Sequence, residues 1–165
     1  MNKQVIKDYE VNRDTIAILP AYHSDYYSIV LERDQEYYVK QTPIRLIKEA
    51  CLEGGADYGG RRTAVIHKLG VQSKVPIPVN PLDQIFAFPT HSPKLHECSW
   101  IFYHHIRSIR VNSHEPTQTI ISFKNYKELP LSFSYHTLEK QMDRTAYCIV
   151  RFSKHPENKP PQLGA

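Results

Sequence analysis

Short β-type runs separated by prolines and polar turns fill most of this chain, and they constrain its fold more than any other feature. Twelve prolines are spread over 165 residues. Because proline cannot donate to a sheet ladder, such runs form short strands, and the proline-rich piece at 75–81 belongs at a sheet edge or in an extended connector. We expect strands at 15–19, 29–31, 36–40, 63–69, 77–79, 84–88, 99–111, 119–123 and 127–131.

The longest of these runs, 99–111, carries a change in its alternation. From Trp100 to Ile106 the even-numbered residues share one face, whereas beyond that point the apolar residues are Ile109 and Val111. A flat strand cannot bury both sets, because successive side chains point to opposite faces. The pattern predicts a bulge or break near 107–108.

Two segments have helical spacing instead. The first runs over about 43–53, with Thr42 as a cap, Pro43 at the first position and a Gly54-Gly55 stop. The second runs over about 135–153, with Ser134 as its cap. One stripe joins its apolar positions, which are Leu138, Met142, Thr145, Ile149 and Phe152.

These elements predict an α+β fold, a mainly antiparallel β domain with one early helix (about 43–53) and one C-terminal helix (about 135–153). The length suits a single domain, which we place at 1–155. Residues 1–14 are polar and expected to fray, and the Pro-rich tail at 156–165 is expected to be disordered. Segment 57–62 is interpreted as a glycine-rich loop.

Positive charge is modest overall but unevenly distributed. The formal net charge is +4, and neither 58–82 nor 98–114 contains an acidic residue. Clustered cations without carboxylates suit phosphate contact, although solvated strand faces have the same pattern. We interpret Arg61 and Arg62 as arginines on the glycine loop that enter a narrow minor groove. The expected phosphate contacts are Lys68, Lys74, Arg107 and Arg110.

Other chemistry has less support in the sequence. A metal-dependent or thiol enzyme would rest on Cys98 and on the four histidines between 91 and 105, whose spacing matches no zinc module. Cys51 and Cys148 lie on or beside helical apolar stripes, and no phosphate-binding glycine motif is present. We therefore expect no catalytic residue, metal or cofactor. Three widely separated cysteines and an N-terminus without an apolar segment indicate a cytoplasmic protein.

Several pieces of the chain, in order, resemble the ComK family of competence transcription factors. They are Tyr9-Glu10-Val11-Asn12 with Thr15–Pro20, Tyr58-Gly59-Gly60-Arg61-Arg62, Ser73-Lys74-x-Pro76-Ile77, Phe88-Pro89-Thr90-His91-Ser92, the lone Trp100, and Ser134–Ala146. One departure is Val75, which replaces a proline of the family pattern. Together the pieces cover roughly 9–152.

The resemblance implies a sequence-specific activator of DNA-uptake genes. Such a protein would recognise AT-rich boxes in double-stranded DNA, largely through the minor groove, as a homodimer or higher homo-oligomer. Its place would be the cytoplasm at the nucleoid, without membrane contact, and RNA polymerase would be a further partner. The usual C-terminal extension has no counterpart, which puts capture by an adaptor and Clp protease in doubt. The alternative is a regulatory paralogue that acts mainly by binding a full-length ComK-type partner.

Overall fold

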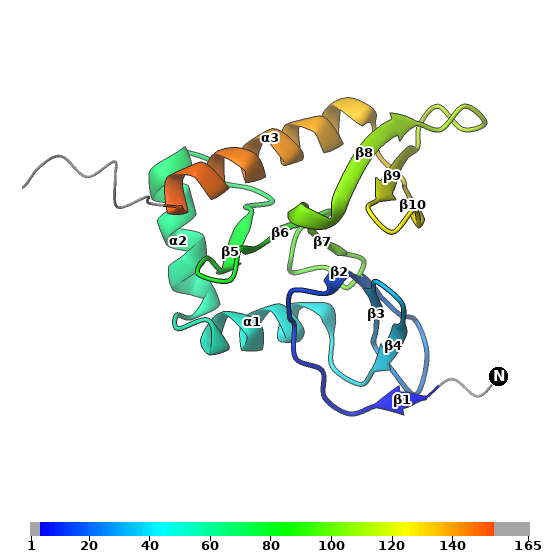
Figure 1. Ribbon diagram of the computed structural model, residues 1–165, viewed down its shortest axis with the longest axis horizontal. Coiled ribbons are helices and arrows are strands. Elements are labelled where there is room, and N and C mark those ends of the chain that lie inside the picture. The colour runs from blue at the N-terminus through cyan, green and yellow to red at the C-terminus, as the bar shows by residue number, and fades with distance from the viewer. Residues whose placement is uncertain (1–3, 154–165) are drawn as a thin grey trace, which may run out of the picture.

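The computed structural model describes residues 4–153 and contains two sheets and three α-helices (Figure 1). The larger sheet has the order β1-β4-β3-β2-β7-β6-β5, and the smaller has the order β10-β9-β8. The strands are β1 (Val5–Ile6), β2 (Thr15–Pro20), β3 (Ser28–Glu32), β4 (Glu36–Val39), β5 (Ile77–Asn80), β6 (Ile85–Pro89), β7 (Trp100–Phe102), β8 (Ile106–Val111), β9 (Thr119–Phe123) and β10 (Glu128–Leu131). The helices are α1 (Pro43–Glu53), α2 (Tyr58–Leu69) and α3 (Tyr135–Phe152), with a 3₁₀ turn, η1, at Tyr103–His105.

Nearly all strand pairs are antiparallel, and β1 with β4 is the parallel exception. Strand β5 forms one edge of the larger sheet, where Pro78 needs no outward hydrogen bond. The edge position predicted for 75–81 is therefore confirmed. The predicted α+β class, mainly antiparallel with an early and a C-terminal helix, is confirmed as well.

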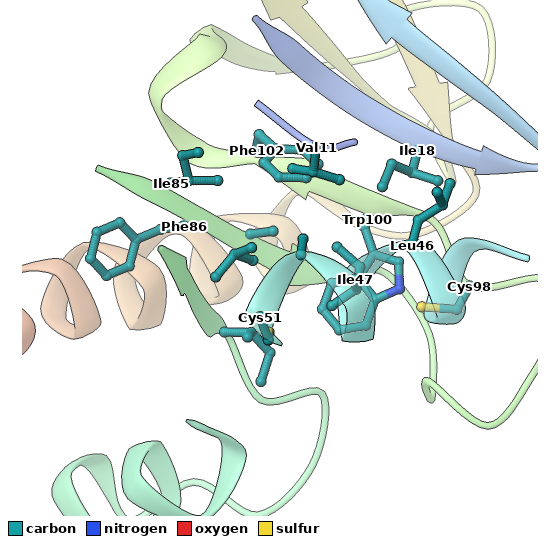
Figure 2. Packing of buried hydrophobic residues seen from close by; sticks show 14 of the residues in the cluster. Val11, Ile18, Leu46, Ile47, Cys51, Ile85, Phe86, Cys98, Trp100 and Phe102 are labelled. Atoms are coloured by element: carbon teal, nitrogen blue, oxygen red, sulfur yellow. The ribbon is translucent and has the colours of Figure 1, made fainter. Parts of the chain in front are cut away.

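The core lies on both faces of the larger sheet. Trp100 and Phe102 of β7 belong to the cluster that packs against α1, whereas Ile101 between them belongs to a second cluster shared with β9 and α3. Figure 2 shows Trp100 among Leu46 and Ile47 of α1. The Trp100 side chain is fully buried. Alternate residues of β7 thus hold the two halves of the core together.

Most of the predicted elements are confirmed. Helix α1 has the predicted bounds, and α3 ends one residue before the predicted end. The predicted interruption of 99–111 is present as η1, followed by a register shift between Ile106 and Ser108. The strands expected at 119–123 and 127–131 are present as β9 and β10, which pair antiparallel around the turn at 124–126.

The loop at 57–62 and the strand at 63–69 were wrong predictions, because α2 occupies this whole segment. Asp57 caps the helix by accepting a hydrogen bond from the Gly60 amide at 2.7 Å. Gly70, at φ 73°, ends the helix in a left-handed conformation. The β-branched residues that favoured a strand include Val65, which the helix buries under the sheet edge.

The expected fraying of 1–14 is also wrong for the part that the structure describes. Strand β1 pairs with β4, and the Tyr9 hydroxyl donates to the Glu32 carboxylate. Residues 1–3 and 154–165, which include the tail expected to be disordered, lie outside the described residues. Within residues 4–153, no helix has the length and apolar character needed to cross a membrane.

Candidate nucleic-acid interface

A groove of about 700 Å³ opens between α1, α2, the connector at 70–76 and the loop at 92–94. Four of its lining residues are cations and none is a carboxylate. The lining consists of Ile44, Lys48, Tyr58, Arg62, Gln72, Ser73, Lys74, Val75, Ser92, Pro93 and Lys94. We call this the basic groove. Within residues 4–153, none of its four cations forms an ion pair with a carboxylate.

Each cation of the basic groove comes from a different segment. Lys48 projects from α1, and its ammonium lies 5.9 Å from the centre of the Tyr58 ring. Arg62 projects from α2 and donates to the Gln72 carbonyl at 3.3 Å, which ties the helix to the connector. Burial raises the pKa of Tyr58, and the charge of Arg62 acts in the opposite direction. The phenol therefore stays neutral and adds no negative charge to the groove.

Helix α3 holds the connector that carries Lys74. The Gln141 amide donates to the Lys74 carbonyl at 2.9 Å and to the Pro89 carbonyl at 3.0 Å. Lys74 has φ 48°, in the left-handed region that few residues with a side chain adopt. Gln141 is buried, and its bond to the Lys74 carbonyl fixes the backbone at this strained residue while its second bond anchors the amide to β6. The wall of the groove is thus set by α3, although α3 does not line it.

The structure brings only two of the predicted site residues, Arg62 and Lys74, together in the basic groove. Arg61 points elsewhere, since its guanidinium donates to the Gly54 carbonyl at the end of α1 at 2.7 Å. Lys68 lies near the other end of α2, with its ammonium 5.6 Å from the centre of the Phe152 ring. These two residues support the packing of α2 against its neighbouring helices.

Arg107 and Arg110 lie on β8, in the smaller sheet. Figure 1 shows β8 and α2 near opposite ends of α3. The Arg110 guanidinium pairs with Glu128 across the sheet at 2.8 Å. Arg107 donates to the Ser122 hydroxyl at 2.9 Å and lies 5.3 Å from the centre of the Tyr126 ring. The predicted cations therefore do not share one surface: Arg62 and Lys74 lie in the basic groove, whereas Arg107 and Arg110 lie on β8.

Two cations of the basic groove, Lys48 and Lys94, were missed from the sequence. Both stand close to acidic residues along the chain, Lys48 next to Glu49 and Lys94 three residues before Glu97. Neither lysine lies in either of the two longest acid-free stretches, so this criterion does not indicate them. A helical projection of 43–53 would have placed Lys48 above Ile44, at the four-residue spacing of one helix face.

The three thiols are buried and poorly suited to nucleophilic chemistry. Burial raises the pKa of Cys51 to about 11 and that of Cys148 to about 12. Cys98, the thiol that an enzyme would have used, is also buried, and burial raises its pKa. Its thiol donates to the His91 carbonyl at 3.3 Å. Because the thiolate is the reactive form, raised pKa values leave these groups inert at neutral pH.

The histidines between 91 and 105 contact separate partners. His96 bonds the Ala21 carbonyl at 2.8 Å, and His105 bonds the Arg13 carbonyl at 2.6 Å. Burial lowers the pKa of both His104 and His105. Among the described residues, no three His, Cys, Asp or Glu side chains gather as metal ligands would.

The fold and the groove define a small, basic α+β protein in which helices and a connector surround a cationic groove free of carboxylates. The ComK protein family matches residues 6–157 of the chain. The chain is also 32% identical over 158 residues to the competence transcription factor of Bacillus subtilis (strain 168), an alignment that covers 95% of this chain and 81% of the relative. The chain therefore belongs to the ComK family, and the resemblance found in the sequence is confirmed. No solved structure matches it significantly.

Proposed function

We propose that this protein is a sequence-specific DNA-binding activator of competence genes, and that its basic groove binds the phosphate backbone. The observation that carries the proposal is the gathering of four cations from four segments in one groove whose lining has no carboxylate. Across the described part of the chain, none of the four forms an ion pair. Cations that neutralise phosphates release condensed counterions, which supplies much of the affinity of a protein for DNA. The relative from Bacillus subtilis is named a transcription factor, which is not an enzyme class.

Within this proposal the cations differ in role. Arg62 and Lys74, with Lys48 and Lys94, contact phosphates from the groove walls. Arg62 is presented by a helix rather than by a mobile loop, so it reaches the edge of an AT-rich minor groove from a fixed position. Arg61 positions α2 through the Gly54 carbonyl. Lys68, Arg107 and Arg110 remain proposed contacts outside the groove.

Fluorescence anisotropy with two duplexes tests this proposal. We expect the chain to bind a duplex with two A/T tracts more tightly than a G·C-rich duplex of the same length. Arg62→Gln should weaken binding to the A/T duplex by about tenfold, as loss of one charged contact does. Lys40→Gln removes an exposed charge outside the groove and serves as the matched control. Equal affinity for both duplexes, or equal effects of the two substitutions, would contradict the proposal.

Assembly belongs to the same proposal. A homodimer or higher homo-oligomer on paired boxes would place one basic groove on each box, and RNA polymerase would be the next partner at the promoter. Sedimentation of the chain with a one-box and a two-box duplex measures this directly. One chain on each duplex would contradict paired binding.

A further inference from the structure

The turn between β9 and β10 places a tyrosine where a hairpin of this type favours glycine. The Phe123 amide donates to the Lys127 carbonyl at 2.9 Å, and the Tyr126 amide donates to the Phe123 carbonyl at 2.9 Å. This is a three-residue hairpin loop whose last residue is left-handed, and glycine is the usual choice there. Tyr126 has φ 68°. The backbone at this residue is therefore strained by the presence of a side chain.

The Tyr126 ring contributes little packing to the fold that would offset this strain. The residue is 77% exposed, a large value for an aromatic residue. Its ring contacts the Arg107 guanidinium, which lies 5.3 Å from the ring centre. Cation–π contacts at exposed sites are the weaker ones. A buried packing role for the ring is thus excluded.

Positively charged residues stand close to Tyr126 in the turn. Lys124 and Lys127 flank Tyr126 in the turn, and both are exposed. The carboxylate that follows them, Glu128, is occupied by Arg110 at 2.8 Å. The arrangement combines an exposed aromatic face with three cations, which are the two groups that proteins use against bases and phosphates.

The turn is also held firmly in place. The Asn125 amide donates to the Arg33 carbonyl in the turn after β3 at 3.0 Å, and the Lys124 amide donates to the His105 carbonyl at 2.9 Å. The Arg107 side chain is also fixed, because it donates a hydrogen bond to the Ser122 hydroxyl. The turn that presents Tyr126 is therefore fixed before binding, so its backbone loses little conformational freedom and the contact gains affinity.

We propose that the β9–β10 turn with Lys124, Tyr126 and Lys127, together with Arg107 of the neighbouring β8, is a second DNA contact that works independently of the basic groove. We call these four residues the hairpin tip. The Tyr126 ring stacks against a base at one step of the duplex, and the three cations hold the adjacent phosphates. The inference rests on the proposed function, because it takes duplex DNA as the partner. It adds a stacking contact to an interface that otherwise consists of charge.

The substitution Tyr126→Gly distinguishes an effect on folding stability from an effect on DNA binding. Glycine accepts the left-handed backbone without strain, so the melting temperature should stay the same or rise by a few degrees. Affinity for the A/T duplex should fall by about tenfold, in line with the loss of one stacked ring. Tyr147→Ala is the matched control, since Tyr147 is an exposed tyrosine of α3 with an arginine, Arg151, 5.9 Å from its ring centre. The control should bind within about twofold of wild type.

A second measurement reports on the stacking of the base directly. With 2-aminopurine placed across the A/T tracts, wild-type binding should change its fluorescence at one step, and Tyr126→Gly should abolish that change. Wild-type affinity of Tyr126→Gly, or a melting temperature lowered by the substitution, would overturn the hairpin contact. If Arg62→Gln weakens binding and Tyr126→Gly does not, only this inference fails. If the wild-type chain binds neither duplex, the proposed function fails first.

Discussion

At the residue scale, two glycines near the junction of α1 and α2, Gly54 and Gly59, differ in whether the fold requires them. A side chain on Gly54 would place its Cβ 2.5 Å from the Val79 carbonyl oxygen, so the end of α1 can approach β5 only without one. Gly59 lies exposed in the first turn of α2, where a Cβ would come no closer than 4.0 Å to the Asp57 carboxylate. The first glycine is required by packing, whereas the fold does not require the second.

This difference predicts opposite effects of the same substitution. Gly54→Ala should lower the free energy of unfolding by about 1–3 kcal/mol, because neither backbone can move away freely. Gly59→Ala should raise it by about 0.5–1 kcal/mol, the usual preference of a helix for alanine. Urea unfolding followed by the fluorescence of the single, buried Trp100 measures both. Two changes of the same sign would show that the junction of α1 and α2 is packed differently.

The residue scale also explains which site residues the sequence could identify. Arg62 and Lys74 stand in an acid-free stretch and lie in the basic groove, but Arg61 stands in the same stretch and does not. Neighbouring helix residues point about 100° apart, so Arg61 faces the end of α1 while Arg62 faces the groove. Without knowing that the segment is a helix, the two arginines could not be told apart.

At the scale of elements, α1 and α3 were predictable and α2 was not. Both segments follow a residue type that often caps helices and carry a regular apolar stripe, which are the signals that a single sequence offers. In the structure Ser134 caps α3, whereas the Thr42 side chain makes no capping bond to α1. Helix α2 has two glycines in its first turn, and Val65 is its one buried residue. Both features lower the helical signal, so contacts with β5 and α3 must stabilise a segment whose own preference is weak.

Because its own preference is weak, α2 should depend strongly on its cap. Asp57→Ala removes the 2.7 Å bond to the Gly60 amide and should lower the free energy of unfolding by about 1 kcal/mol. Thr42 occupies the same position before α1, but its side chain makes no capping bond. Thr42→Ala should therefore change the stability by less than about 0.5 kcal/mol. Thermal unfolding by circular dichroism compares the pair, and equal losses would contradict this account of α2.

At the scale of the whole molecule, the position of the charges matters more than their sum. The chain has 21 lysines and arginines against 17 acidic residues, so its net charge of +4 is unremarkable. Folding pairs or embeds some of these cations, such as Arg110 and Arg61. Within residues 4–153, the cations of the basic groove and of the hairpin tip form no ion pair with a carboxylate. Composition could suggest a polyanionic partner but could not place the surface that meets it.

The salt dependence of DNA binding tests that placement directly. Each phosphate neutralised by the protein adds about 0.9 to the slope of log affinity against log salt concentration. Lys48→Gln with Lys94→Gln should therefore lower the slope by about 2, because both side chains line the basic groove. Lys7→Gln with Lys40→Gln removes the same charge from exposed positions outside the groove and should leave the slope within about 0.5 of wild type. Anisotropy titrations of the A/T duplex at four salt concentrations give both slopes. Equal slopes of log affinity against log salt concentration for the two double variants would mean that the net charge alone, and not the groove, attracts DNA.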